Sequence, residues 1–166
     1  MSIAIGSMGV KVYYTVAADT AAPTTGATFT EIPEVKSIPS LSPAPDTLET
    51  TPLSNTEYKS YINGLKDLGG ALEFTVNLTQ DLLDMWNGTG ASDTNSVMYK
   101  FNNLTSGNTM WLCIVHPKLT QSVYFPFEPA RLGLPEINVN EVLEGTLSIT
   151  PIGEVEWAAK PTISGE

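Results

Sequence analysis

The stretch GALEFTVNLT, residues 70–79, decides how the chain can fold. Apolar and polar side chains alternate along it from Leu72 to Thr79, which is the period-two pattern of a strand with one buried face. The connection before it, about residues 39–69, is polar and has little periodicity. Compact domains seldom contain so long a connection unless it is functional or disordered. We therefore interpret residues 39–69 as an assembly loop and the strand as its anchor in a β-sheet body.

The composition is that of one acidic domain spanning residues 1–166. Charged residues make up 16% of the chain, against about 25% in average soluble domains, which favours a surface available for protein contacts. The chain has 18 acidic and 8 basic residues, with Arg131 as the only arginine and a net charge of −10. This balance argues against a protein that grips phosphates. It leaves open an ordinary acidic soluble protein and a surface that stays near nucleic acid without binding it.

Nothing in the sequence predicts export or insertion into a membrane. The N-terminal residues lack the basic region and apolar core of a signal peptide, and no apolar run approaches the ~18 residues of a membrane span. Cys113, the only cysteine, lies in an apolar run and is predicted to be a buried, inert thiol. We expect a protein that is made and assembled in the cytoplasm and has no membrane partner.

Most of the remaining chain is predicted to form short strands. These are residues 10–16, 29–38, 97–101, 109–116, 121–132, 137–150 and 154–157. Pro33 should place its strand at an edge or a bulge, and Gly145 is expected to form a bulge. The run 109–116 is apolar on both faces, which predicts a central strand, and it should form a hairpin with 97–101.

One short helix is expected over residues 79–88. Thr79 is its predicted N-cap and Asp81 lies favourably in its first turn. Spacing of apolar residues also allows a helical turn near 57–62 in the assembly loop. Together these elements indicate a mainly β domain, a β-sandwich or flattened barrel, with one short α-helix and a long extended loop.

No residues form a recognisable catalytic or metal-binding set. His116 is the only histidine, and its place at the end of an apolar strand favours a structural or surface role over that of a catalytic base. One histidine and one cysteine do not supply the usual zinc ligands, and no phosphate-binding glycine motif is present. A glycosidase-type carboxylate pair stays open, since sequence does not show separations. We expect a protein that is not an enzyme and needs no cofactor or metal.

The assembly loop contains apolar side chains but no stripe that could form a core of its own. Ordering one backbone residue costs about 1–2 kcal/mol, and scattered contacts on the chain's own surface are not expected to offset that cost over the whole loop. The loop should therefore be mobile in the free subunit or ordered by a neighbouring molecule.

The same region carries a family resemblance. The segments ETTPLS (49–54), GLKDLG (64–69) and LEFTV (72–76), with residues 58–62 between them, resemble the major tail proteins, or tail tube proteins, of long-tailed bacteriophages. Asn55 stands where many members have an acidic residue. The resemblance implies a virion protein that forms hexameric rings, whose sheets join into one ring-closed β-barrel. Stacked rings would form a tube through which double-stranded DNA passes into the host.

The resemblance also implies partners and contact residues. The subunit would contact copies of itself, a length-setting protein and a terminator, while DNA passes without specific binding. The inter-subunit loop would present Leu48, Glu49, Thr50, Thr51, Leu53, Tyr58, Tyr61 and Leu65. We further predict that carboxylates line the lumen and repel phosphates over a screening length of about 8–10 Å. The candidates are Glu31, Glu34, Glu73 and Glu128.

Two other functions compete with this one. A tube subunit of a contractile injection or secretion system would share the fold. A monomeric β-sandwich that binds carbohydrate, for example, would need an exposed platform built from the chain's aromatic side chains, of which the candidates are Tyr13, Tyr14, Trp86, Trp111, Tyr124 and Trp157. A hydrolase on a β-sandwich has no motif to support it.

Overall fold

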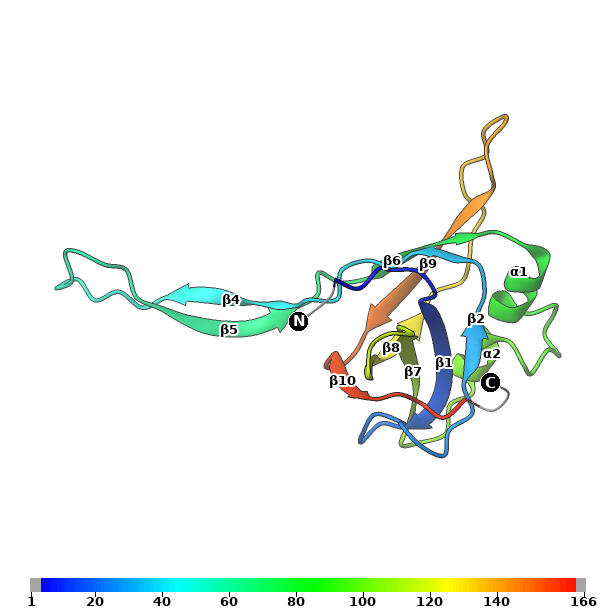
Figure 1. Ribbon diagram of the computed structural model, residues 1–166, viewed down its shortest axis with the longest axis horizontal. Coiled ribbons are helices and arrows are strands. Elements are labelled where there is room, and N and C mark those ends of the chain that lie inside the picture. The colour runs from blue at the N-terminus through cyan, green and yellow to red at the C-terminus, as the bar shows by residue number, and fades with distance from the viewer. Residues whose placement is uncertain (1–3, 164–166) are drawn as a thin grey trace.

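The computed structural model, which describes residues 4–163, has a rolled antiparallel sheet as its body and a long hairpin that projects from it (Figure 1). The order of hydrogen-bonded strands is β2 (Thr30–Ile32), β1 (Lys11–Ala18), β7 (Asn108–Val115), β8 (Gln121–Pro129), β9 (Glu144–Pro151), β6 (Leu72–Asn77) and β3 (Val35–Ser37). A further strand, β10 (Glu156–Ala159), pairs with β8. The mainly β, flattened-barrel class predicted from the sequence is confirmed.

The two end strands of this sheet are consecutive in the chain. Only Pro33 and Glu34 separate β2 from β3, so the ends of these strands are at most ~11 Å apart. Glu34 adopts a left-handed backbone conformation with φ of 63°. Its carbonyl accepts a hydrogen bond of 2.9 Å from the backbone nitrogen of Asn77 on β6. The single strand predicted over 29–38 is therefore wrong in its continuity: a turn at Pro33 and Glu34 divides it into β2, which pairs with β1, and β3, which pairs with β6.

Apolar side chains on the inner face of the rolled sheet form the main core. Phe74, Phe125 and Phe127 are completely buried there. A second, smaller cluster lies on the outer face of the middle strands and contains Tyr13, Trp111, Cys113 and Tyr124. The segment after β1 packs on it, and so do Ala158 and Ile163. β7 is therefore buried on both faces and pairs with β1 and β8, which confirms the predicted central strand.

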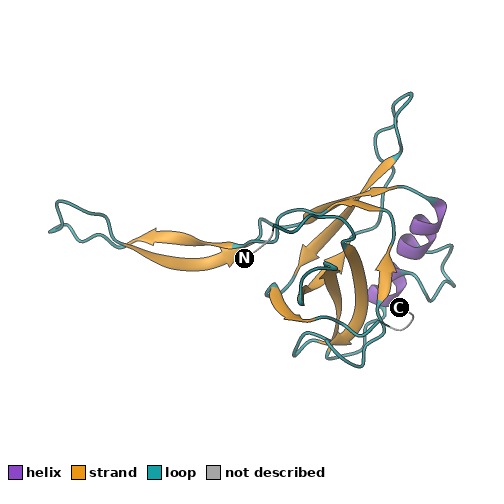
Figure 2. Ribbon diagram, in the orientation of Figure 1, coloured by secondary structure: helices purple, strands orange, loops and turns teal. Residues whose placement is uncertain are grey.

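The first helix covers the inner core as the sequence predicts. α1 spans Gln80–Asn87, and its N-cap Thr79 accepts a hydrogen bond from the backbone nitrogen of Leu82 at 3.2 Å. Leu82 and Trp86 are completely buried beneath it. α1 lies at the side of the body opposite the projecting hairpin (Figure 2).

A second helix, α2 (Val97–Asn102), replaces a predicted strand. Ser96 accepts a hydrogen bond from the backbone nitrogen of Tyr99 and caps the helix. Val97 and Phe101 stand four residues apart, which places them on one helical face toward the core. The predicted strand 97–101 and its hairpin with 109–116 are wrong, because apolar residues in so short a segment fit both the strand and the helix period, and the Ser96 cap favours the helix.

The region around β9 differs from the sequence prediction in two ways. The expected strand 137–150 begins only at Glu144, and residues 133–143 form a loop outside the sheet. Gly145 pairs regularly with Val76, so the expected bulge is wrong. Gly145 is instead buried under Leu132, whose Cδ1 would lie 3.3 Å from a Cβ at this position. The glycine therefore gives Leu132 room to pack on the strand.

The projecting hairpin is formed by the assembly loop. β4 (Ala44–Glu49) and β5 (Tyr61–Asp67) pair with each other, and their register runs from Ala44 opposite Asp67 to Glu49 opposite Tyr61. We call residues 44–67 the arm. The helical turn expected near 57–62 is wrong, because Tyr61 and Ile62 belong to β5. Cross-strand pairing orders the backbone that seemed aperiodic in the sequence.

Candidate assembly surface

The arm continues the pairing of β3 and β6. β3 leads into it, β6 follows it, and these two strands pair antiparallel in the body. The arm is therefore an extended connection between two paired strands, and Figure 1 shows it reaching far from the body. A groove of about 430 Å³ lies at its root, between residues 64–68 at the end of β5 and residues 151–155 at the end of β9.

The apolar side chains of the arm point into solvent. Leu53 is fully exposed, Leu65 is 88% exposed and Tyr58 is 78% exposed. Leu48 and Ile62 lie directly opposite each other in the hairpin, and both are more than half exposed. All eight residues predicted for the inter-subunit loop, from Leu48 to Leu65, lie on the arm; of these, seven are exposed and Thr51 is half-buried.

Local polar contacts hold the outer part of the arm. The Lys59 ammonium lies 3.2 Å from a Glu49 carboxylate oxygen. The side-chain nitrogen of Asn55 donates to the carbonyl of Tyr58 at 2.6 Å, and the backbone nitrogen of Ser60 donates to the hydroxyl of Thr51 at 2.9 Å. Exposed contacts of this kind contribute little to stability, and a two-stranded hairpin alone is at best marginally stable in water. Local contacts within the arm therefore define its hairpin conformation, but the arm has no hydrophobic core to stabilise it.

A second exposed apolar segment was missed by the sequence analysis. We call residues 133–143 the β8–β9 loop. Val139 is 88% exposed and Leu134 is 78% exposed, and Ile137 and Val142 are mainly exposed. The alternation of apolar residues and asparagines at 137–140 predicts a strand, but this segment pairs with no strand among the described residues. Figure 1 shows the loop extending from the body on a different side from the arm.

The four candidate lumen carboxylates occupy three different settings. Strand register places Glu73 opposite Ser148 and Glu128 opposite Thr150, so both glutamates flank β9 on its outer face. Both are exposed, and neither has a hydrogen bond or ion pair within residues 4–163. Their neighbours on β6 and β9 are short polar side chains, which makes this part of the outer face an open polar surface.

The other two candidates have partners in the chain. Glu31 lies on the same face but beyond the covered aromatic cluster, and its carboxylate is 3.8 Å from the Lys11 ammonium. Glu34 lies in the turn that joins β2 to β3, where its carboxylate accepts a hydrogen bond from the Asn77 side chain at 3.1 Å. The structure therefore places Glu73 and Glu128 on the same face, on either side of β9, and places Glu31 and Glu34 elsewhere.

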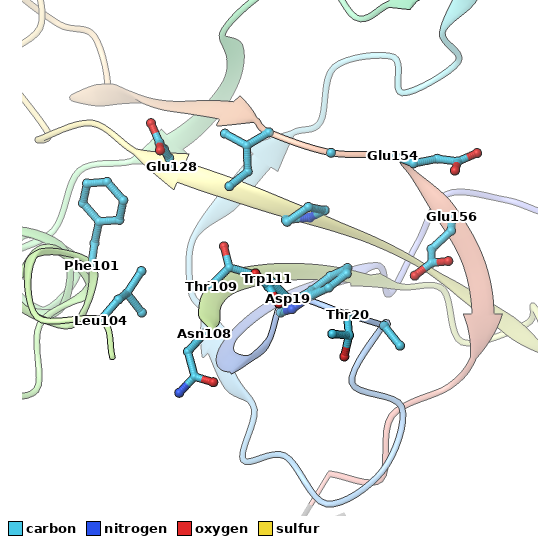
Figure 3. A pocket seen from close by; sticks show the side chains of 14 residues that line it. Asp19, Thr20, Phe101, Leu104, Asn108, Thr109, Trp111, Glu128, Glu154 and Glu156 are labelled. Carbon is cyan, nitrogen blue, oxygen red and sulfur yellow. The ribbon is translucent and has the colours of Figure 1, made fainter. Parts of the chain in front are cut away.

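A larger groove lies beside Glu128, between the outer face of the sheet and the α2 region (Figure 3). It has a volume of about 650 Å³, and its apolar side includes Phe101, Leu104 and Trp111. Its carboxylates, which come from three separate segments of the chain, are Asp19, Glu128, Glu154 and Glu156. The groove adds negative charge next to the open polar surface.

The described residues offer little support for metal binding, a catalytic histidine, a membrane span or a carbohydrate-binding platform. Among residues 4–163, no group of three or more His, Cys, Asp and Glu side chains is placed to hold a metal ion. The Nε2 atom of His116 lies 2.7 Å from the carbonyl of Gly6, which fits a structural role. Over the same residues, neither helix has the length and apolar content needed to cross a bilayer. Of the six aromatic side chains proposed for a carbohydrate platform, only Trp157 is exposed.

Several solved structures match the chain, and two of them do so over nearly its whole length. A chain of the six-fold symmetrised baseplate of the anti-feeding prophage aligns with a TM-score of 0.60 and 11% identity, covering 96% of this chain and 98% of that chain. A chain of the cap of the same prophage, described as its tube-terminating cap, aligns with a TM-score of 0.52 and 12% identity, covering 96% and 95%. No known protein family and no curated protein matches the sequence. The chain thus shares the fold of these prophage components, and membership of the long-tailed phage family stays a prediction.

Proposed function

We propose that this protein is a structural subunit of a phage-tail-like assembly, and specifically a tail tube protein that forms stacked hexameric rings. The observation that carries the proposal is the arm, which pairs only with itself and presents large apolar side chains to solvent. Monomeric soluble proteins rarely leave such a surface uncovered. The shared fold with a chain of a six-fold symmetrised baseplate supports a ring of six copies.

In the proposed tube the arm of each copy contacts a neighbouring copy. The open polar surface around Glu73 and Glu128 lines the lumen, and double-stranded DNA passes along it without specific binding. The role is mechanical and not enzymatic, and the particle is put together in the cytoplasm with a length-setting protein and a terminator. Low lumen affinity for DNA follows from the surplus of carboxylates, because phosphate binding depends on lysines and arginines.

Removing the arm tests this proposal. Replacing residues 48–62 with an Asn-Gly turn joins Thr47 to Asn63, which are opposite each other in the hairpin. The shortened protein should keep the circular dichroism and melting temperature of the body but remain monomeric. The full chain should form rings or tubes in electron micrographs at rising concentration. A full chain that stays monomeric at every concentration, or a shortened chain that still assembles, would contradict the proposal.

Point variants at the tip give a matched comparison. Leu53→Asp and Tyr58→Asp place a charge on exposed apolar positions, whereas Thr56→Asp adds the same charge to an exposed polar position in the same turn. The first two should prevent assembly and the third should not.

A baseplate or cap position is a second candidate, because the two matched chains belong to a baseplate and to a tube-terminating cap. A tube subunit should stack into long tubes of its own. A baseplate or cap subunit should stop at single rings, and electron microscopy of the purified protein separates these outcomes.

A further inference from the structure

The β8–β9 loop is anchored at both ends but carries an uncovered apolar tip. At its start, the side chain of Asn87 bonds both backbone groups of Leu132. At its end, the carbonyl of Leu143 accepts a hydrogen bond of 2.9 Å from the backbone nitrogen of Leu78. Between these anchors the loop turns at Asn140, which has a φ of 65°. Hydrogen bonds thus fix both ends of the loop to the body, while the apolar side chains between them remain exposed. A loop of this kind presents its apolar side chains in a defined position, which favours contact with another molecule.

The loop and the arm leave opposite ends of one ladder. β6 and β9 pair from Leu72 opposite Ile149 to Asn77 opposite Glu144. The arm returns to the body just before Leu72, whereas the loop enters β9 at Glu144. The ladder is ~17 Å long, and the arm points away from it (Figure 1). The two apolar segments of one chain therefore face in different directions and do not meet.

This arrangement suits a head-to-tail contact between copies. A displacement along the ladder brings the arm of one copy toward the loop of the next, and such a contact between two different surfaces can repeat around a ring or along a stack. In such a contact apolar side chains pack against apolar side chains, because both the arm and the β8–β9 loop expose aliphatic residues. The charges of the two segments are complementary. Lys66 on β5 has no ion pair within residues 4–163, and Glu136 and Glu141 on the β8–β9 loop have none either.

The free edge of β5 is better suited to this contact than the edge of β4. β4 contains Pro45, which lacks a backbone N–H and weakens an edge for further pairing. β5 has no proline, and it exposes Tyr61, Ile62 and Leu65 next to Lys66.

We propose that the apolar tip of the β8–β9 loop of one copy docks on the β5 side of the arm of the next copy. The inference rests on the proposed function, because it names the surface that receives the arm. Ile137, Val139 and Val142 cover the exposed side chains of β5, and Lys66 faces the two loop glutamates.

Disulfide cross-linking between two singly substituted proteins tests the contact. One protein carries Leu65→Cys and the other Val139→Cys, so a bond between them can only join different copies. The native Cys113 is completely buried and does not compete. Under mild oxidation we expect a covalent dimer that forms only after assembly. Met8→Cys, which replaces another exposed side chain far from the loop in sequence, is the control partner for Leu65→Cys and should give none.

Two variants that each add one negative charge to the β8–β9 loop measure how much its apolar side chains contribute to assembly. Val139→Asp should raise the concentration needed for assembly by at least about tenfold, because a carboxylate would be buried without a partner. Asn138→Asp adds the same charge at the neighbouring polar position and should have little effect. Assembly without the arm–loop cross-link, with Val139→Asp assembling like the parent, would overturn the docking and leave the proposed function intact. A parent chain that never assembles would overturn both.

Discussion

The side-chain amide of Asn87, the last residue of α1, makes both backbone hydrogen bonds of Leu132. Its Nδ2 donates to the Leu132 carbonyl at 2.8 Å, and its Oδ1 accepts from the Leu132 nitrogen at 2.9 Å. The neighbouring Trp86 donates its ring N–H to the carbonyl of Ala130 at 2.8 Å. Side chains of α1 thus supply the hydrogen bonds that a neighbouring strand would otherwise give to the segment after β8. These bonds fix the position at which the β8–β9 loop starts.

Asn87→Ala should lower both stability and assembly. The change leaves two partly buried backbone groups of Leu132 without partners, which should reduce the free energy of unfolding by about 1–3 kcal/mol. Urea unfolding followed by circular dichroism measures this loss. Asn103→Ala removes an exposed side-chain bond at the end of α2 and serves as the control, with a smaller expected loss. Equal losses in the two variants would show that the Asn87–Leu132 pair has no special weight.

Backbone amides of the arm should exchange quickly in the free subunit and slowly in the assembly. The arm has few buried contacts, so its local opening costs little free energy, whereas β7 should resist exchange in both states. Hydrogen–deuterium exchange of peptides covering 44–67, compared before and after assembly, measures the difference. Strong protection of these peptides in the monomer would contradict the view that a neighbouring copy stabilises the arm.

Neutralising the two unpaired lumen candidates should make assembled tubes retain DNA. Glu73→Gln combined with Glu128→Gln removes two negative charges from the open polar surface, and the resulting retention should fall as salt screens the remaining field. Fluorescent duplex DNA held by tubes at low and at physiological salt is the readout. Asp81→Asn combined with Asp84→Asn removes the same charge from α1 and is the control. Identical DNA retention in both double variants at low salt would contradict a lumen position.

High pH should destabilise the fold through its outer aromatic cluster. Burial raises the pKa of the Cys113 thiol from 9.0 to about 12, and burial likewise raises the pKa of Tyr124. Both groups are easier to ionise in the unfolded chain, so the free energy of unfolding should fall as pH rises from 9 toward 12. Urea unfolding at several pH values measures the slope, and Cys113→Ala should reduce it. An unchanged slope in this variant would exclude the thiol as a contributor.

The same burial should protect the thiol from chemical modification. At pH 8 the folded protein should contain far less thiolate than the unfolded chain, because burial raises the pKa of Cys113. A thiol reagent should therefore label Cys113 only after denaturation, whereas an added Met8→Cys should react at once.

Sequence patterns predicted the elements whose periodicity is long or whose caps are clear. The alternation at 72–78 gave β6, the Thr79 cap gave α1, and the apolar run 109–116 gave the central strand β7. The edge position expected for the segment around Pro33 agrees with β2 and β3, which lie at the two ends of the sheet order, because proline cannot donate to a ladder. These signals are local, so the sequence alone was sufficient to locate them.

The missed features depend on partners that are distant in sequence. β4 and β5 become strands only because they pair with each other, and no periodicity marks either of them. Residues 137–142 have the composition of a strand but pair with no strand among residues 4–163. The grouping of Glu73 with Glu128 follows from the register of β6 and β8 on β9, which a sequence does not specify.

The way the arm joins the body has a mechanical consequence. Force on the arm reaches the body through β3 and β6, and it pulls both strands along their own axes. The ladder bonds between β6 and β9 lie perpendicular to that direction, so all of them are strained together and none can open first. A tensile load at the tip of the arm is thereby distributed over the whole β6–β9 ladder in shear. The two-stranded arm can therefore transmit force from one subunit to the next without the ladder bonds breaking one after another from its end.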